Sequence, residues 1–285
     1  MTTSVGIVGL DYCGSTLINN ILSGLPNCIG AGETHWIVDR VRNPKQTGRC
    51  TECYLSHCPV FSDETLEKMQ DEEQIENGNW WQIISDSARV DVVVSGDKRP
   101  RHYERFGVPD KLLLIVKDPR SHIVSWARRK YPPADGSHAK AYHQGETNYS
   151  LTDEQFENAL KFWIRETRRH ITWSIDSGKP LAVISLESFV QNDELNLKSL
   201  SNWLGVDCDL DALKYWETGL HYIGGNHSVK RLDNQRYFFK QIKIDKRWES
   251  VLTESQANSI ISNQSVLAQL DRLKPYLIGR QQFIH

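Results

Sequence analysis

The stretch that most constrains the fold is "VGIVGLDYCGSTLINNIL", residues 5–22. It begins with an apolar run typical of a buried strand and continues with the apolar spacing of an amphipathic helix. Between the two, residues 9–16 read GxxxxGST, the phosphate-loop pattern with Ser15 in the position of the nucleotide-binding lysine. A strand that leads through such a loop into a helix is a unit of a parallel α/β sheet.

Three further apolar runs, at residues 90–95, 112–116 and 181–186, alternate with longer amphipathic segments. Runs that are apolar at every position suit strands that are covered on both faces. The pattern therefore predicts an α/β fold with three layers, α/β/α, around a central parallel sheet. A helix is predicted to begin after Thr152, because Thr152 and Gln155 have the spacing of a capping box.

The chain of 285 residues, 39% hydrophobic, is long enough to bury one substantial core, and residues 1–285 are predicted to form a single domain. Two irregular stretches interrupt the alternation of strands and helices. The first, at about residues 40–80, contains cysteines, and the second, residues 130–150, is a candidate lid over an acceptor. Insertions in α/β domains usually lie at the ligand-binding edge of the sheet.

The charge and the apolar content limit the partners of the chain. A net charge of −2 gives no basic field for nucleic acid. The N-terminus does not resemble a signal peptide, and no apolar window approaches the length of a membrane span, so a cytoplasmic protein is expected. The sequence does not indicate an oligomeric state.

The loop without its lysine can still hold an anion. In nucleotide triphosphatases the lysine reaches the β- and γ-phosphates, and the hydroxyl after it holds magnesium. With Ser15 at that position, backbone N–H groups and the positive end of the next helix still favour an anion between Cys13 and Thr16. The hydroxyls of Ser15 and Thr16 are extra donors. A phosphate-loop kinase is therefore disfavoured, and a turn without any ligand is the alternative.

A second anion site is predicted in "LLLIVKDPRSHIVSWARRK", residues 112–130. A buried strand ends at Lys117, and Ser121 and Ser125 lie one turn apart on the helix that follows. A cation at the end of a strand and hydroxyls on the first turns of the next helix predict a phosphate pocket beside the first one. The alternative is a solvated basic helix.

Together the two pieces resemble the sulfotransferases that use 3′-phosphoadenosine-5′-phosphosulfate (PAPS). In that family a loop of the form [RK]SG[TS]T holds the 5′-phosphosulfate, and an RDPR motif followed by a serine holds the 3′-phosphate. Residues 13–16 match the last four positions of the first motif, and residues 117–120 match RDPR with a leading lysine. Ser125 has the family spacing from Lys117. Further segments are similar to the family along nearly the whole chain: "GETHW", "SGDKRPRHY", "SLESFVQNDELNLKSLSNWLGV", "HYIGGNHSVKRL" and "IKIDKRWESVLT".

The resemblance implies a transfer of the sulfuryl group from PAPS to a hydroxyl or amine, which releases 3′,5′-adenosine bisphosphate and requires no metal. A small-molecule or carbohydrate acceptor is favoured. Glu33 of "GETHW" is implied as the base, with His35 as the reserve base and an ordinary surface loop as the alternative. Lys98 of "SGDKRPRHY" is implied to reach the transferring group. The implied nucleotide-binding residues are Tyr12, Cys13, Gly14, Ser15, Thr16, Lys117, Ser125, Asn226 and Arg231.

Tyr12 departs from the family pattern. It stands where the family has arginine or lysine at the bridging oxygen of the leaving group. A tyrosine can donate a hydrogen bond there but brings no positive charge. Lys98 is the candidate to compensate, with a surface lysine as the alternative. The same departure favours a second hypothesis, a non-catalytic relative that binds PAPS.

Three of the six cysteines gather in "CTECYLSHC", where Cys50 and Cys53 have the CxxC spacing of a zinc site. A structural zinc needs four ligands, and the adjacent His57 and Cys58 are an awkward pair for one tetrahedral ion. Buried free thiols are therefore expected, and no metal site is predicted.

Overall fold

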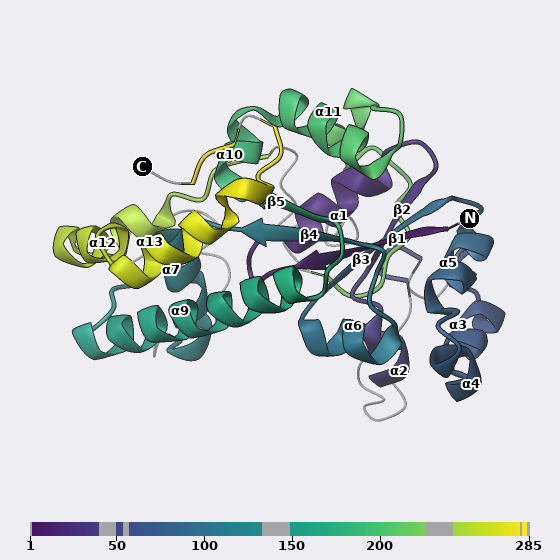
Figure 1. Ribbon diagram of the computed structural model, residues 1–285, viewed down its shortest axis with the longest axis horizontal. Helices are drawn as coiled ribbons and strands as arrows, with labels where there is room; N and C mark the ends of the chain where they lie inside the picture. Colours follow the sequence, from purple (N-terminus) through teal and green to yellow (C-terminus); the bar gives the residue numbers. More distant parts are fainter. Residues whose placement is uncertain are drawn as a thin grey trace.

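The computed structural model describes residues 2–39, 50–53, 57–132, 149–225, 242–279 and 281–283. Five strands form one sheet in the order β2-β3-β1-β4-β5, and all neighbouring strands are parallel (Figure 1). The phosphate-loop strand is therefore central in the sheet. The strands are β1 (Thr3–Val8), β2 (Cys28–Gly32), β3 (Val92–Lys98), β4 (Lys111–Val116) and β5 (Leu181–Ser185).

Helices cover both faces of the sheet, which confirms the predicted α/β fold. Successive residues of β4 enter opposite cores, with Leu112 and Leu114 in one cluster and Leu113 and Ile115 in the other. In Figure 1, α1 and α11 lie above the sheet and α6 and α9 below it. One face of the sheet is covered by α1 (Ser15–Ser23), α10 (Leu186–Gln191), α11 (Asp193–Leu204) and the 3-10 helix η1 (Leu210–Lys214).

The other core contains side chains from the helices that follow β3, β4 and the second insertion. The remaining helices are α2 (His35–Asp39), α3 (Asp63–Gln70), α4 (Glu72–Glu76), α5 (Trp80–Ala88), α6 (Pro100–Phe106), α7 (Pro119–Lys130), α9 (Asp153–Asp176), α12 (Glu254–Ile261) and α13 (Gln264–Leu273), with the 3-10 helices η3 (Arg247–Ser250) and η4 (Lys274–Tyr276). In the part of the chain that the structure describes, none of them combines the length and apolar character that crossing a bilayer demands.

The four apolar runs are confirmed as β1, β3, β4 and β5, whereas β2 was not predicted. Its sequence, CIGAG, has too few large apolar residues to show the strand pattern. Glycine is required there because α1 packs directly against the strand. A Cβ at Gly30 would lie 2.1 Å from the carbonyl oxygen of Asn19, and the Asn19 side chain accepts a hydrogen bond from the Gly32 N–H at 3.0 Å.

The predicted helix after Thr152 is α9. Its capping box is present: the Thr152 hydroxyl accepts from the Gln155 N–H at 3.2 Å, and the Gln155 side chain accepts from the Thr152 N–H at 3.2 Å. Of the two predicted insertions, the first contains α3 and α4 among its described residues. The second lies mostly outside the described residues.

Candidate active site

The two predicted anion sites are neighbours, because β1 and β4 are adjacent parallel strands and their carboxyl ends lie at the same edge. The loop after β1 contacts α7 directly, where His122 Nε2 lies 2.8 Å from the carbonyl oxygen of Asp11. Burial lowers the pKa of His122 to about 3, so the neutral ring donates this hydrogen bond from Nε2. A pocket between the two sites is lined by residues that include Gly9, Cys13, Lys117, His122, Trp163 and His170.

The phosphate loop contains two residues in the left-handed backbone region. Gly14 has a φ of +94° and caps α1, and a Cβ there would lie 2.7 Å from the side chain of Leu186. Tyr12 has a φ of +70°, and its side chain is 37% exposed. A non-glycine residue held in this region is a feature of functional loops. Tyr12 is thus presented at the surface of the loop.

Cys13 has its side chain in the core beneath the loop, 1% exposed. Burial raises the pKa of the thiol to about 11, and Lys98 only partly offsets this. The thiol is neutral at physiological pH. The backbone N–H of Cys13 already donates to the carbonyl oxygen of Leu10 at 3.1 Å, whereas Thr16 lies on the first turn of α1.

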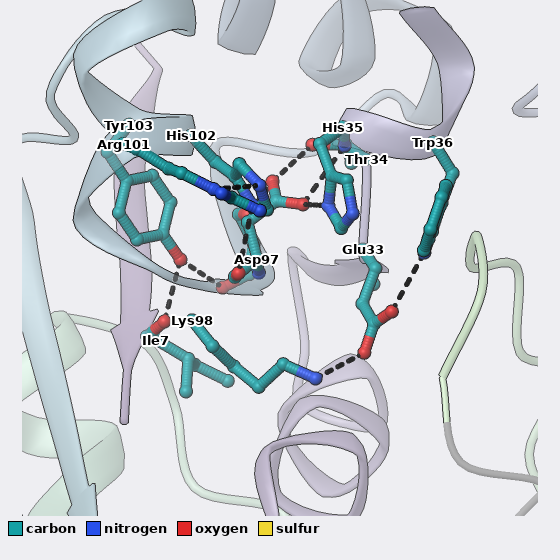
Figure 2. A network of polar contacts seen from close by, with 12 residues as sticks. Ile7, Glu33, Thr34, His35, Trp36, Asp97, Lys98, Arg101, His102 and Tyr103 are labelled. Carbon is teal, nitrogen blue, oxygen red and sulfur yellow. Dashed lines mark hydrogen bonds and ion pairs between the residues drawn. The ribbon is translucent and has the colours of Figure 1, made fainter. Parts of the chain in front are cut away.

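Lys98 and Glu33 form an ion pair beside the loop (Figure 2). Lys98 ends β3, Glu33 follows β2, and these neighbouring strands bring Lys98 Nζ within 2.5 Å of Glu33 Oε1. The indole N–H of Trp36 donates to the other Glu33 oxygen at 2.9 Å. The side chains of Lys98 and Glu33 are only 13% and 16% exposed. Lys98 has a φ of +63°, the second strained non-glycine residue of the site.

Lys98 stays a cation despite its burial. Burial alone would lower the pKa of Lys98, but the carboxylates of Glu33 and Asp11 more than offset this and raise it. Asp11 lies 3.7 Å from Lys98 Nζ and pairs with Arg99 at 2.5 Å. Burial opposes the charge on Asp11, yet Lys98 and Arg99 hold its pKa below the ordinary value. A positive charge from another strand therefore lies beside the loop residue Asp11.

His35 is turned toward Asp97, away from the pair of Lys98 and Glu33 (Figure 2). Its Nδ1 lies 2.6 Å from a carboxylate oxygen of Asp97, and its ring stacks on His102 with centroids 3.9 Å apart. Asp97 is 1% exposed and also accepts from the Thr34 hydroxyl at 2.7 Å. Burial opposes the charge on Asp97, but the hydrogen bonds from His35 and Ser95 lower its pKa. The structure thus brings Glu33 to Lys98, whereas His35 contacts Asp97. This contact links the residues that follow β2 to the end of β3.

Replacing His35 by alanine should lower the free energy of unfolding by roughly 1–3 kcal/mol, because the buried Asp97 carboxylate loses a donor. Affinity for 3′,5′-adenosine bisphosphate should stay the same. Urea denaturation and calorimetric titration of His35→Ala measure the two effects. A variant with native stability but no turnover would instead identify His35 as the base.

The second predicted site is built around Lys117, which is 6% exposed at the end of β4. Its Nζ lies 3.2 Å from the Ser125 hydroxyl and 2.7 Å from a carboxylate oxygen of Asp245. Asp245 also pairs with Arg247 at 2.6 Å, and its carbonyl accepts from the Ser121 hydroxyl at 2.7 Å. Burial opposes the charge on Asp245, but Arg247 and Lys117 hold its pKa far below the ordinary value. A carboxylate thus lies where the sequence predicts a phosphate.

Some residues of the candidate site were not predicted, and two predicted residues lie outside the part of the chain that the structure describes. Asn226 and Arg231 belong to the latter group. Asp11, Asp97 and Asp245 were missed, although Asp11 lies within the phosphate loop and Asp245 within "IKIDKRWESVLT". No sequence motif assigns a role to these three aspartates. Only their contacts with Lys98, His35 and Lys117 suggest one.

Comparison with known proteins identifies the family of this chain. The family model described as "Sulfotransferase family" matches residues 4–210. The sulfotransferase domain from the curacin biosynthetic pathway is similar in structure, with a TM-score of 0.55 and 14% identity over 100% of this chain and 99% of that one. The sulfotransferase domain from the Synechococcus PCC 7002 olefin synthase has a TM-score of 0.49 and 16% identity, over 92% of this chain and 95% of that one. A search among curated proteins finds no match. Since the match takes in most of the chain, including both predicted anion sites, the chain belongs to the sulfotransferase family.

Proposed function

We propose that this sulfotransferase takes its sulfuryl group from PAPS and transfers it to a hydroxyl or amine of a small molecule or carbohydrate. The observation that carries the proposal is the adjacency of two anion sites at the ends of β1 and β4. PAPS has anionic groups at both its 5′ and 3′ positions, so it requires two such sites. The N-terminus of α1 offers one, and Lys117 with Ser125 offers the other.

Lys98 and Glu33 are the proposed catalytic pair. In the transfer, the bond between sulfur and the bridging oxygen of the leaving phosphate breaks, and a bond to the acceptor oxygen or nitrogen forms. Lys98 neutralises the charge that develops on the leaving phosphate. Glu33 takes the proton of the acceptor. Since Lys98 and Glu33 contact each other at 2.5 Å, Lys98 must exchange Glu33 for the leaving phosphate, and this exchange frees Glu33 to act as the base.

We propose that the Asp245 carboxylate occupies the position of the 3′-phosphate when no nucleotide is bound. Replacing Asp245 by asparagine should tighten binding of 3′,5′-adenosine bisphosphate by about tenfold, because the variant removes a competing anion from Lys117 and Arg247 (about 1.4 kcal/mol). Calorimetric titration measures the change. Asp271→Asn is the matched control, since Asp271 pairs with Lys274 on the exposed surface of α13. Weaker binding to Asp245→Asn would show that Asp245 orients Lys117 for the phosphate.

One experiment separates the remaining hypotheses. Calorimetric titration with 3′,5′-adenosine bisphosphate and with ATP plus magnesium comes first, followed by turnover of labelled PAPS against a panel of acceptors. We expect preference for the bisphosphate, because Ser15 replaces the lysine that binds triphosphates. Preference for ATP would favour a kinase. Binding of PAPS without turnover of any acceptor would favour the non-catalytic relative that Tyr12 suggests.

We also propose that residues 1–285 form one domain. Residues of α12 and α13 share a core cluster with residues of β1, β4 and β5, which supports this proposal. The cytoplasmic location stays a prediction.

A further inference from the structure

Four side chains that the proposed reaction does not use converge beside the active site. They are Cys50, Cys53, Cys58 and His221, whose sulfur and nitrogen atoms all lie within 4.8 Å of one another. His221 Nδ1 lies 3.8 Å from the sulfur of Cys50, 3.4 Å from that of Cys53 and 3.5 Å from that of Cys58. Cys50 and Cys58 are buried, and Cys53 and His221 are half-buried.

Hydrogen bonding alone does not explain this convergence. One imidazole nitrogen either donates a single hydrogen or accepts with a single lone pair, so hydrogen bonding does not require that it approach all three sulfur atoms at once. The distances fit a tetrahedron around a metal ion instead. Zinc lies about 2.3 Å from sulfur and about 2.0–2.1 Å from histidine nitrogen, and the tetrahedral angle then separates sulfur from nitrogen by about 3.6 Å. The three measured distances lie on both sides of that value.

The local backbone supports bound thiolates. The N–H of Phe61 donates to the sulfur of Cys58 at 3.2 Å. Backbone N–H groups of Glu52 and Cys53 hydrogen-bond the sulfur of Cys50. Such bonds from the backbone orient metal ligands and stabilise their negative charge. The short spacing from Cys50 to Cys53 is the one that zinc sites use.

We propose that Cys50, Cys53, Cys58 and His221 bind one structural zinc ion. Three thiolates and one imidazole complete a tetrahedral set, which leaves no position for a water or substrate, so the ion has no part in the sulfuryl transfer. Zinc also suits this combination of soft sulfur ligands and imidazole. The expectation of free thiols rested on His57 as the fourth ligand, whereas the structure brings His221 to Cys58 across 163 positions of the chain.

The proposed zinc ion fixes a segment that contacts both parts of the active site. After His221, Ile223 accepts a hydrogen bond from the Glu33 N–H at 2.8 Å, and Gly224 accepts one from the Thr51 hydroxyl at 2.9 Å. A Cβ at Gly225 would lie 2.9 Å from the side chain of Thr16 on the first turn of α1. The ion would therefore anchor the first insertion and this segment against Glu33 and the phosphate loop. Only this positioning role rests on the proposed function.

The metal content of the full chain tests the proposal directly. Protein purified without chelator should contain about one zinc per chain by elemental analysis. His221→Ala and Cys53→Ser should lose most of this zinc on gel filtration. The matched controls His57→Ala and Cys208→Ser should keep it, because His57 and Cys208 are exposed and do not belong to the cluster. If His57→Ala lost the zinc and His221→Ala kept it, the assignment would be overturned.

Two further measurements do not depend on the variants or on turnover. Chain refolded with cobalt(II) should show the visible absorption of a tetrahedral cobalt–thiolate site. Native alkylation should label Cys50, Cys53 and Cys58 only after a chelator is added. Metal-free chain with these cysteines freely alkylated, a disulfide between two of them, or iron in place of zinc would each overturn the proposal. Since none of these readouts needs PAPS, failure of the zinc site and failure of the proposed reaction are distinguishable.

Discussion

Lys98→Ala should reduce turnover by about 100- to 1000-fold, the typical effect of removing one preorganised charge from the transition state. Affinity for 3′,5′-adenosine bisphosphate should change little, because the two anion sites stay intact. The expected loss is large because Tyr12 brings no positive charge to the loop, and the pKa of Lys98 is raised by Glu33 and Asp11 despite burial. Steady-state kinetics with PAPS and calorimetric titration measure the two quantities.

The controls for Lys98→Ala separate charge from packing. Lys98→Met keeps the buried apolar stem and should lose as much turnover as Lys98→Ala, whereas Lys98→Arg should recover part of it. Lys111→Met is the unrelated control, because Lys111 donates to the carbonyls of Trp203 and Leu204. Unchanged turnover in Lys98→Ala would refute the assignment of Lys98 as the principal cation.

Glu33→Gln should lower kcat by about 100- to 10,000-fold, the usual contribution of a general base. Glutamine keeps the shape of the side chain, but its single oxygen cannot accept from both Trp36 and Lys98, so the free energy of unfolding should fall by roughly 1–3 kcal/mol. Nucleotide affinity should be retained. Trp36→Phe is the matched control: it removes the hydrogen bond from Trp36 and leaves the carboxylate, and it should cost far less. If Glu33→Gln kept the native kcat, another residue would have to be the base.

The double variant tests whether Lys98 and Glu33 act as a unit. Their side chains contact each other at 2.5 Å, and effects of residues that act together are not additive. Lys98→Ala combined with Glu33→Gln should therefore lose much less turnover than the product of the two single losses. Additive losses would mean that the two residues serve separate steps.

The fold was largely predictable because its signals are local. The apolar runs of β1, β3, β4 and β5 and the capping box of α9 depend on residues within a few positions of one another. β2 escaped prediction because its glycines serve a contact with α1 and leave no apolar pattern. The neighbouring anion sites followed from a general rule, that the carboxyl ends of parallel strands meet at one edge.

The site was predictable only in part. Lys117 was predicted from its place at the end of β4, whereas Lys98 was implied by the family resemblance. A surface lysine was a nearly equal interpretation of Lys98 until its 13% exposure was known. Glu33 and His35 were both predicted as bases. Their hydrogen bonds separate them, because Glu33 contacts Lys98 and His35 contacts Asp97.

The sequence by itself determined the strand–loop–helix units, the family resemblance and the residue types that the chemistry requires. Only the tertiary structure decided which of these residues meet: Glu33 and Lys98 across 65 positions, Lys117 and Asp245 across 128, and Cys58 and His221 across 163. The physical reason is that periodicity and capping reflect interactions within one element. Contacts between distant segments depend instead on the order of strands in the sheet and on the paths of the loops that join them.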